Sequence, residues 1–209
     1  TFSDATSPAE AACTEPLAVC LHAVAQAGDL RGAKVLVTGA GPIGLLTIAA
    51  ARQAGAGVIV ATDLTDAALQ RAPAMGADRS INVATDAHAL LPYQESKGYF
   101  DVIFDCSAAA PALRTAFACV RPRGTIVQVG VTGDLTIPLN ALVGKEIVWR
   151  GSQRFHDEFT IAAELISSRG IDVRPIISHS FPLGEAKAAF EQAGDRSTAC
   201  KVQLTFSAD

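Results

Sequence analysis

Three glycines at a fixed spacing are the residues of this sequence best suited to holding a ligand. Gly39, Gly41 and Gly44 form the pattern G-x-G-x-x-G between a short apolar run and an apolar helical stretch. Here the first glycine permits a tight turn, the second lets the backbone approach a pyrophosphate, and the third allows close contact between helix and strand. Free N–H groups and the helix dipole attract the phosphates. We therefore expect a dinucleotide at this turn, with Pro42 and Ile43 completing it; the alternative is a glycine-rich turn without a ligand.

An acidic residue ends the next apolar run, 58–63. A carboxylate at the position of Asp63 can accept hydrogen bonds from both hydroxyls of the cofactor's ribose. It also repels a 2′-phosphate, and the next residues, Leu64 to Asp66, carry no positive charge to offset that repulsion. We predict NAD rather than NADP, with Asp63 and Leu64 in the cofactor site. The alternative is that Asp63 caps the following helix, a role for which Thr65 is a rival.

Apolar runs and helical stretches must alternate around these residues to position them. The expected strands are 35–38, 58–63, 80–83, 99–104 and 124–129. The expected helices between and before them are 15–27, 43–54, 65–75 (interrupted or bent near Pro73), 87–96 and 110–120. This alternation predicts an α/β fold with right-handed crossovers, the doubly wound parallel sheet of the Rossmann fold. Beyond Gly130 we expect helices at 158–168 and 184–193 and an alternating strand at 200–206.

Composition narrows the class of protein further. The chain of 209 residues is 49% hydrophobic and 18% charged, which suits strands covered on both faces by helices. Its net charge of −4, without a Lys/Arg cluster, argues against nucleic acid or anionic membrane as partners. Five cysteines without a C-x-x-C pair indicate free thiols in a reducing compartment. With neither a signal peptide nor an apolar run long enough to span a membrane, we expect a soluble, cytoplasmic protein.

Several segments together resemble the zinc-containing medium-chain alcohol and polyol dehydrogenases. They are 15–23 (beginning Glu-Pro-Leu), 35–44, 61–64, 97–102, 127–130, 144–147, 150–155 (Arg-Gly-Ser-Gln-Arg-Phe) and 199–204. The resemblance covers essentially the whole chain and is closest to the branch that contains the sorbitol and L-idonate dehydrogenases. It implies an oxidoreductase that passes a hydride from a secondary alcohol of a polyol or sugar acid to NAD, with L-idonate to 5-ketogluconate as the preferred assignment.

The resemblance also assigns candidate roles at two positions. Glu15 matches a glutamate beside the catalytic zinc, where it would stabilise the metal or relay a proton; alternatively it is a helix-start acid, with Pro16 at the first helical position. Arg154 matches an arginine that contacts substrate hydroxyls or nearby cofactor, since its guanidinium offers several donors in a fixed fork. The alternative for Arg154 is a surface ion pair with Asp157 or Glu158.

A third part of the site follows the strand predicted at 124–129. There the family places backbone around the nicotinamide, which implies that Val129, Gly130 and Val131 contact it. One position departs from the family: Ala68 stands where sorbitol-type relatives often have an arginine near the adenine. Adenine stacking is expected to be weaker for that reason, while the preference for NAD does not depend on it.

The resemblance implies, finally, that the metal half of such an enzyme lies outside this chain. We expect residues 1–21 to be a connector from an N-terminal catalytic domain, 22–175 to bind NAD, and 176–209 to return partly to the catalytic domain. Zinc belongs to that domain, so the chain alone should bind NAD without turnover. A homo-oligomer through the sheet edge at 147–149 is expected. The competing interpretations are a stand-alone NAD-binding or regulatory module and a zinc-free quinone reductase relative, which would favour NADP and lack Glu15.

Overall fold

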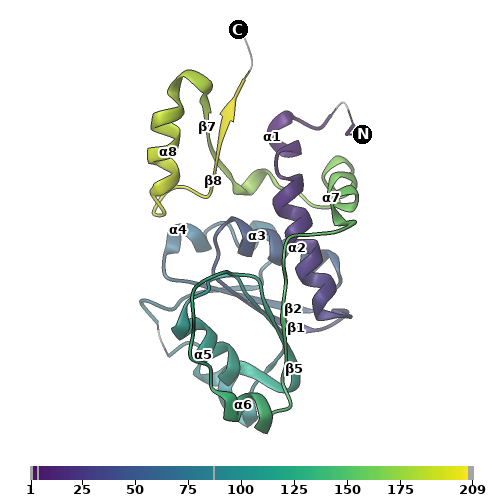
Figure 1. Cartoon of the computed structure of the whole chain (residues 1–209), viewed down its shortest axis with the longest axis vertical. Coiled ribbons are helices and arrows are strands. Elements are labelled where there is room, and N and C mark those ends of the chain that lie inside the picture. The colour runs from purple at the N-terminus through teal and green to yellow at the C-terminus, as the bar shows by residue number, and fades with distance from the viewer. Residues whose placement is uncertain (1, 4, 87, 207–209) are drawn as a thin grey trace.

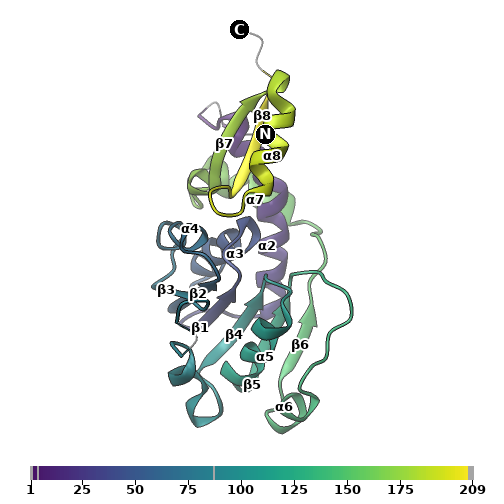
Figure 2. The same ribbon diagram turned by 90° about the vertical axis from the view of Figure 1, so that its left-hand side faces the viewer.

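A parallel sheet forms the larger part of the molecule in this computed structural model, which describes residues 2–3, 5–86 and 88–206. Its six strands are β1 (Lys34–Thr38), β2 (Val58–Asp63), β3 (Arg79–Asn82), β4 (Phe100–Asp105), β5 (Val120–Gln128) and β6 (Val148–Gly151). They lie in the order β3-β2-β1-β4-β5-β6, and all neighbours run parallel (Figure 2). This is the strand order of the Rossmann fold, so the predicted fold class is confirmed. The order reverses between β1 and β4, where such sheets bind their ligands.

Helices cover both faces of this sheet. One face packs against α2 (Thr14–Ala27) and α3 (Pro42–Gln53), and α7 (Glu158–Ser167) packs in turn on α2. The other packs against η2 (Leu91–Lys97), α5 (Ala110–Cys119) and α6 (Leu139–Gly144). Successive residues of a strand point to opposite faces, so Val37 belongs to the first core and Leu36 to the second. Both strand faces are therefore apolar, which explains the continuous apolar runs in the sequence.

A separate small unit follows at the end of the chain. It is built from β7 (Ile177–Pro182), α8 (Ala186–Gly194) and β8 (Lys201–Thr205), with β7 and β8 parallel. Short turns of helix, η3 (Arg174–Ile176) and η4 (Leu183–Glu185), lead into β7 and α8. Figure 1 shows this unit at the same end of the molecule as α1 (Pro8–Ala11), and the side chain of Gln203 donates to the carbonyl of Ala9 at 2.9 Å. The helix predicted at 184–193 is confirmed as α8 and the strand predicted at 200–206 as β8, whereas β7 was not predicted.

Two helix predictions in the middle of the chain need correction; the interruption expected near Pro73 is confirmed, but the helical part is much shorter than predicted. The helix expected at 65–75 is only α4 (Asp66–Leu69), followed by the short turn η1 (Pro73–Met75). Pro73 has no N–H to continue the helix, and its ring obstructs the preceding turn. The helix expected at 87–96 is the 3₁₀ segment η2, in which Glu95 and Ser96 leave helical geometry; residue 87 lies outside the described residues.

Smaller differences concern the ends of elements. Pro16 is the third residue of α2 rather than the first, because the helix begins at Thr14. β5 begins at Val120, earlier than predicted, with a register shift opposite β4 that accommodates the extra residues. In the described part of the chain, no helix has the length and apolar content needed to cross a lipid bilayer.

Candidate functional site

The glycine turn lies at the carboxyl end of β1. Gly39 has a φ of +88°, a left-handed conformation that glycine adopts without strain, and its N–H donates to the carbonyl of Thr62 at 2.8 Å. A Cβ on Gly44 would lie 1.8 Å from the carbonyl oxygen of Gly39, so helix α3 and β1 touch at this point. A Cβ on Gly41 would meet no atom within 4 Å. Gly41 thus leaves open space where a pyrophosphate can approach the backbone, as the spacing predicts.

The start of α3 offers donors to an anion at this open space. Gly41 is the N-cap and supplies no side-chain hydrogen bond, and Pro42 occupies the first turn. The N–H of Leu45 is the first of the helix to bond inward, to the carbonyl of Gly41 at 2.9 Å. The earlier N–H groups point out of the helix, as at any uncapped N-terminus, and the helix dipole adds partial positive charge. A phosphate group fits these donors.

Asp63 is joined directly to the glycine turn. Its Oδ2 accepts from the N–H of Ala40 at 2.7 Å, and its Oδ1 accepts from the N–H groups of Leu64 at 2.7 Å and Thr65 at 3.1 Å. Thr65, not Asp63, is the N-cap of α4, because its hydroxyl accepts from the N–H of Ala68. Each carboxylate oxygen has about two acceptor positions, so Oδ2 still has one for a ribose hydroxyl.

The loops that follow β4 and β5 close the crevice on its other side. A Cβ on Gly39 would lie 3.0 Å from the backbone nitrogen of Ser107, and one on Gly130 would lie 2.8 Å from that of Ala108. The backbones of the three loops therefore approach one another as closely as glycine allows. Ala108 itself has a φ of +54°, a left-handed conformation that disfavours a side chain.

A buried carboxylate that the sequence did not reveal ties these strand ends together. Asp105, the last residue of β4, is fully buried. It accepts from the hydroxyl of Thr38 at 2.6 Å, the hydroxyl of Ser107 at 2.7 Å and the side-chain amide of Gln128 at 2.7 Å. Each of these partners is a polar residue at or just after the end of an apolar strand. That position is the sequence signal that could have revealed the cluster around Asp105.

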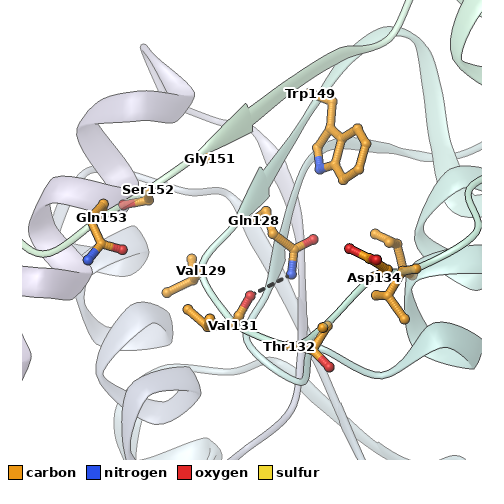
Figure 3. A pocket seen from close by; sticks show the side chains of 13 residues that line it. Gln128, Val129, Val131, Thr132, Asp134, Trp149, Gly151, Ser152 and Gln153 are labelled. Atoms are coloured by element: carbon orange, nitrogen blue, oxygen red, sulfur yellow. Dashed lines mark hydrogen bonds between the residues drawn. The ribbon is translucent and has the colours of Figure 1, made fainter.

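The predicted nicotinamide residues are anchored by the same strand end. The carbonyl of Asp105 accepts from the N–H groups of Val129 at 3.0 Å and Gly130 at 2.8 Å. Beside them is a groove of about 620 Å³, lined by segment 128–135 with Trp149 and Ser152 of the neighbouring strand and loop (Figure 3). The side chain of Val131 is 84% exposed at the rim of this groove.

Glu15 and Arg154 lie on other elements. Glu15 is exposed in the first turn of α2, and Arg154 is exposed directly after the groove residue Gln153, with a φ of +53°. Within the described residues, no hydrogen bond or ion pair connects either side chain to the glycine turn or Asp63. The structure thus unites the glycine turn with Asp63, and Val129 and Gly130 with Asp105, but leaves Glu15 and Arg154 separate.

The suggested ion pair between Arg154 and Glu158 is replaced by a different contact. Glu158 Oε1 lies 2.9 Å from Nδ1 of His22, and its Oε2 accepts from the N–H of His156 at 2.7 Å. The two imidazole rings meet edge to face at 5.0 Å. Burial raises the pKa of Glu158, but the hydrogen bonds from His22 and the backbone outweigh it and hold that pKa below its usual range. These contacts connect α2 to the start of α7.

The donor set of the described residues does not fit a catalytic zinc. No three His, Cys, Asp or Glu side chains among them come together in a group that could hold a metal ion. All five cysteines are free thiols, and burial raises the pKa of Cys20 to about 12, against an opposing hydrogen bond with Thr47. A buried thiol of that kind is not a ready metal ligand, because the thiolate is the form that binds.

Comparison with known proteins agrees with this geometry. Residues 42–168 match the family model described as zinc-binding dehydrogenase. The chain is 40% identical to L-idonate 5-dehydrogenase (NAD(P)(+)) of Escherichia coli K12 over 92% of its length and 56% of that protein, and 33% identical to sorbitol dehydrogenase of Gallus gallus over 87% and 52%. The crystal structure of the Escherichia coli L-idonate 5-dehydrogenase superposes with a TM-score of 0.94 at 38% identity, covering 98% of this chain and 59% of that one. The chain thus spans about half the length of these relatives, and it belongs to the zinc-binding dehydrogenase family.

Proposed function

We propose that this chain is the NAD-binding part of a dehydrogenase that oxidises a secondary alcohol of a polyol or sugar acid. The proposed substrate is L-idonate and the product 5-ketogluconate. The observation that supports the proposal is the hydrogen bond from the N–H of Ala40 to Asp63, which joins the glycine turn after β1 to the acid that ends β2. An acid in this position can bind the ribose of a dinucleotide whose pyrophosphate lies at the turn. NAD would supply the hydride acceptor, while the chain's own residues bind and orient it.

The proposed cofactor contacts divide along the crevice. The turn 39–44 would receive the pyrophosphate, and Asp63 with Leu64 the adenosine ribose. Val129, Gly130 and Val131 would surround the nicotinamide, next to the groove of Figure 3. The Asp63 carboxylate supports NAD over NADP, because a 2′-phosphate would place negative charge against it. The Escherichia coli relative carries NAD(P)(+) in its name, so this preference needs its own measurement.

Arg154 and Glu15 would serve the substrate end of the complete site. Arg154 is exposed, follows the groove residues and holds a strained backbone conformation, a combination that recurs at functional sites. We propose that its guanidinium binds the hydroxyls or the carboxylate of the substrate. Glu15 is proposed to lie beside a zinc ion held by residues of a catalytic domain outside this chain, since the described residues do not hold one.

The relation between the chain and that catalytic domain is part of the same proposal. We assign 1–21 to a connector, 22–175 to NAD binding and 176–209 to a segment that partly joins the catalytic domain. The separate β7–α8–β8 unit supports the last assignment, because it exposes Phe190 and Phe206 at about three quarters of their surface. Helix α2 spans the proposed boundary at 21/22 and packs on α3 of the NAD-binding part.

A homo-oligomer through the free edge of β6 is also proposed. All four residues of β6 are exposed, including the apolar Val148 and Trp149, and Val143 of the adjacent α6 is 70% exposed. An edge strand with unpaired backbone groups and apolar side chains favours pairing with a second copy.

The proposed activity is tested by assaying a panel of substrates with the protein purified from its host. With NAD, we expect the highest kcat/KM for L-idonate among L-idonate, D-gluconate, sorbitol, xylitol and L-threonine. The chain of residues 1–209 alone should bind NADH without turning over any of them. A preference for L-threonine would contradict the proposed substrate class, and turnover by the 209-residue chain alone would contradict the proposed division of labour.

A further inference from the structure

Three polar side chains lie in register across the middle of the sheet. Thr38 ends β1, Asp105 ends β4 and Gln128 ends β5, and the strand pairing places Thr38 opposite Asp105 and Asp105 opposite Gln128. Their chain neighbours Val37, Phe104 and Val127 all face the core under α2 and α3. The polar row therefore lies on the opposite face, at the carboxyl edge that borders the proposed cofactor site.

Asp105 is the central acceptor of this row. Its Oδ1 accepts from the hydroxyls of Thr38 and Ser107 and from the N–H of Ser107 at 3.1 Å, and its Oδ2 accepts from the amide of Gln128. Burying a carboxylate is costly unless it is hydrogen-bonded. Here every bond requires the partner to donate, so the charge fixes the orientation of both hydroxyls and of the Gln128 amide.

The partners of Asp105 lead to the two halves of the proposed cofactor site. Gln128 precedes Val129, and its amide also donates to the carbonyl of Gly130 at 2.9 Å, the dashed line in Figure 3. Thr38 precedes Gly39 of the phosphate turn. That turn has anchors of its own, because Gly39 donates to Thr62 and Ala40 to Asp63. The loop after β5 depends more heavily on Asp105, through its side chain and its carbonyl.

We propose that Asp105 is a positioning residue that sets the nicotinamide half of the site relative to the phosphate turn. The inference rests on the proposed function, since it concerns the same cofactor. An asparagine at this position cannot accept with its NH₂ group. A Gln128 amide that turned to accept from it would lose the bond to the carbonyl of Gly130 and release the loop.

Asp101 provides a matched control on the same strand. Near the other end of β4, it accepts from the N–H of Lys34 at 2.7 Å and pairs with Arg121, so it also links β1 to β5. It lies at the amino edge of the sheet, away from the crevice. If both carboxylates act only as structural links, neither substitution should change the ratio of the NADH and ADP-ribose affinities.

The test compares NADH with ADP-ribose, which lacks the nicotinamide. Isothermal titration gives the Kd of each for the wild-type chain, Asp105→Asn and Asp101→Asn, alongside their thermal midpoints. We expect Asp105→Asn to raise the Kd of NADH by about tenfold, equivalent to about 1.4 kcal/mol. The Kd of ADP-ribose should change by less than about twofold. Asp101→Asn should leave the ratio of the two Kd values at the wild-type value.

The outcomes separate this inference from the proposed function. If wild type binds both ligands and Asp105→Asn leaves the ratio of their Kd values unchanged, Asp105 does not position the nicotinamide half of the site. If wild type binds neither ligand, the proposed function itself fails. Should Asp105→Asn not fold, Gln128→Leu removes the bond to Asp105 and the bond to the Gly130 carbonyl together, and it must show the same selective loss of NADH binding.

Discussion

The N–H of Ala40 donates to Oδ2 of Asp63 at 2.7 Å, so the residue that ends β2 holds the turn that follows β1. In the proposed cofactor site, this carboxylate would have two effects on a dinucleotide. It would fix the distance between the pyrophosphate and the ribose, and it would place negative charge where a 2′-phosphate would lie. Both effects can be measured separately.

Asp63→Asn should change cofactor choice. Wild type is expected to bind NADH more tightly than NADPH. The variant keeps an oxygen that can accept from Ala40 but loses the negative charge. Binding of NADH should therefore weaken by about tenfold, since a charge-assisted hydrogen bond of about 1.5 kcal/mol is lost. NADPH should bind to the variant more tightly than to wild type. Fluorescence titration with both reduced cofactors measures this. Asp66→Asn, at an exposed acid nearby, is the control; wild-type binding of NADPH as tight as NADH would overturn the prediction.

Gly44→Ala should destabilise the fold where Gly41→Ala does not. The added methyl group at Gly44 meets the carbonyl oxygen of Gly39 at 1.8 Å, so α3 must move away from β1. We expect the free energy of unfolding in urea to fall by about 3 kcal/mol, the upper range for overpacking. Gly41 has a φ of −69° and open space around it, so its variant should stay within about 0.5 kcal/mol of wild type. Equal stability of the two variants would contradict the packing described here.

Ala108→Gly should stabilise the protein. Ala108 is held at a φ of +54°, where a Cβ costs about 1–2 kcal/mol, and glycine relieves that cost while adding chain entropy to the unfolded state. The net gain expected in urea unfolding is up to about 1 kcal/mol. Ala112→Gly, inside α5, is the control and should lose about 1 kcal/mol. A loss of stability on Ala108→Gly would show that the left-handed conformation carries no strain.

Stability should fall at acid pH as Asp78 becomes protonated. The N–H of Ile59 lowers the pKa of Asp78, and Arg52 lowers it further against the opposing effect of partial burial. A carboxyl whose folded pKa is depressed stabilises the fold above its unfolded pKa, near 3.9, and loses that contribution as the pH falls through its folded pKa. Urea unfolding between about pH 5 and pH 2 should be less pH-dependent in Asp78→Asn than in wild type. The same slope in both proteins would exclude this contribution.

The free edge of β6 should mediate self-association. Val148→Lys places a charge on the exposed edge, so the sedimentation-derived mass should fall toward that of one chain. Leu91→Lys, an equally drastic change at an exposed apolar residue of η2, is the control and should leave the mass unchanged. A wild-type chain that sediments as a monomer at all concentrations would contradict the proposed interface for this chain.

The sequence predicted the parts of the candidate site that lie close together along the chain. The glycine turn and Asp63 belong to one βαβ unit, in which the spacing along the chain determines that they come into contact. Asp105 and Gln128 were missed because their contact depends on the register of two strands, which pairing across the sheet sets. The interruption of the helix at 65–75 was predicted from Pro73, but the helix ends earlier than its apolar spacing suggested, at Leu69. β7 was missed because β8, its strand partner among the described residues, follows an intervening helix.

Titration of the chain with NADH tests the central claim most directly. We expect saturable enhancement of nicotinamide fluorescence with one site per chain, and NAD and ADP-ribose should each compete with NADH for that site. Gly41→Ala should weaken NADH by about tenfold or more, since a methyl group would occupy the approach of the pyrophosphate, while its thermal midpoint stays at the wild-type value. Absence of saturable binding by the wild-type chain, or equal affinity in Gly41→Ala, would contradict the assignment of the glycine turn as the cofactor site.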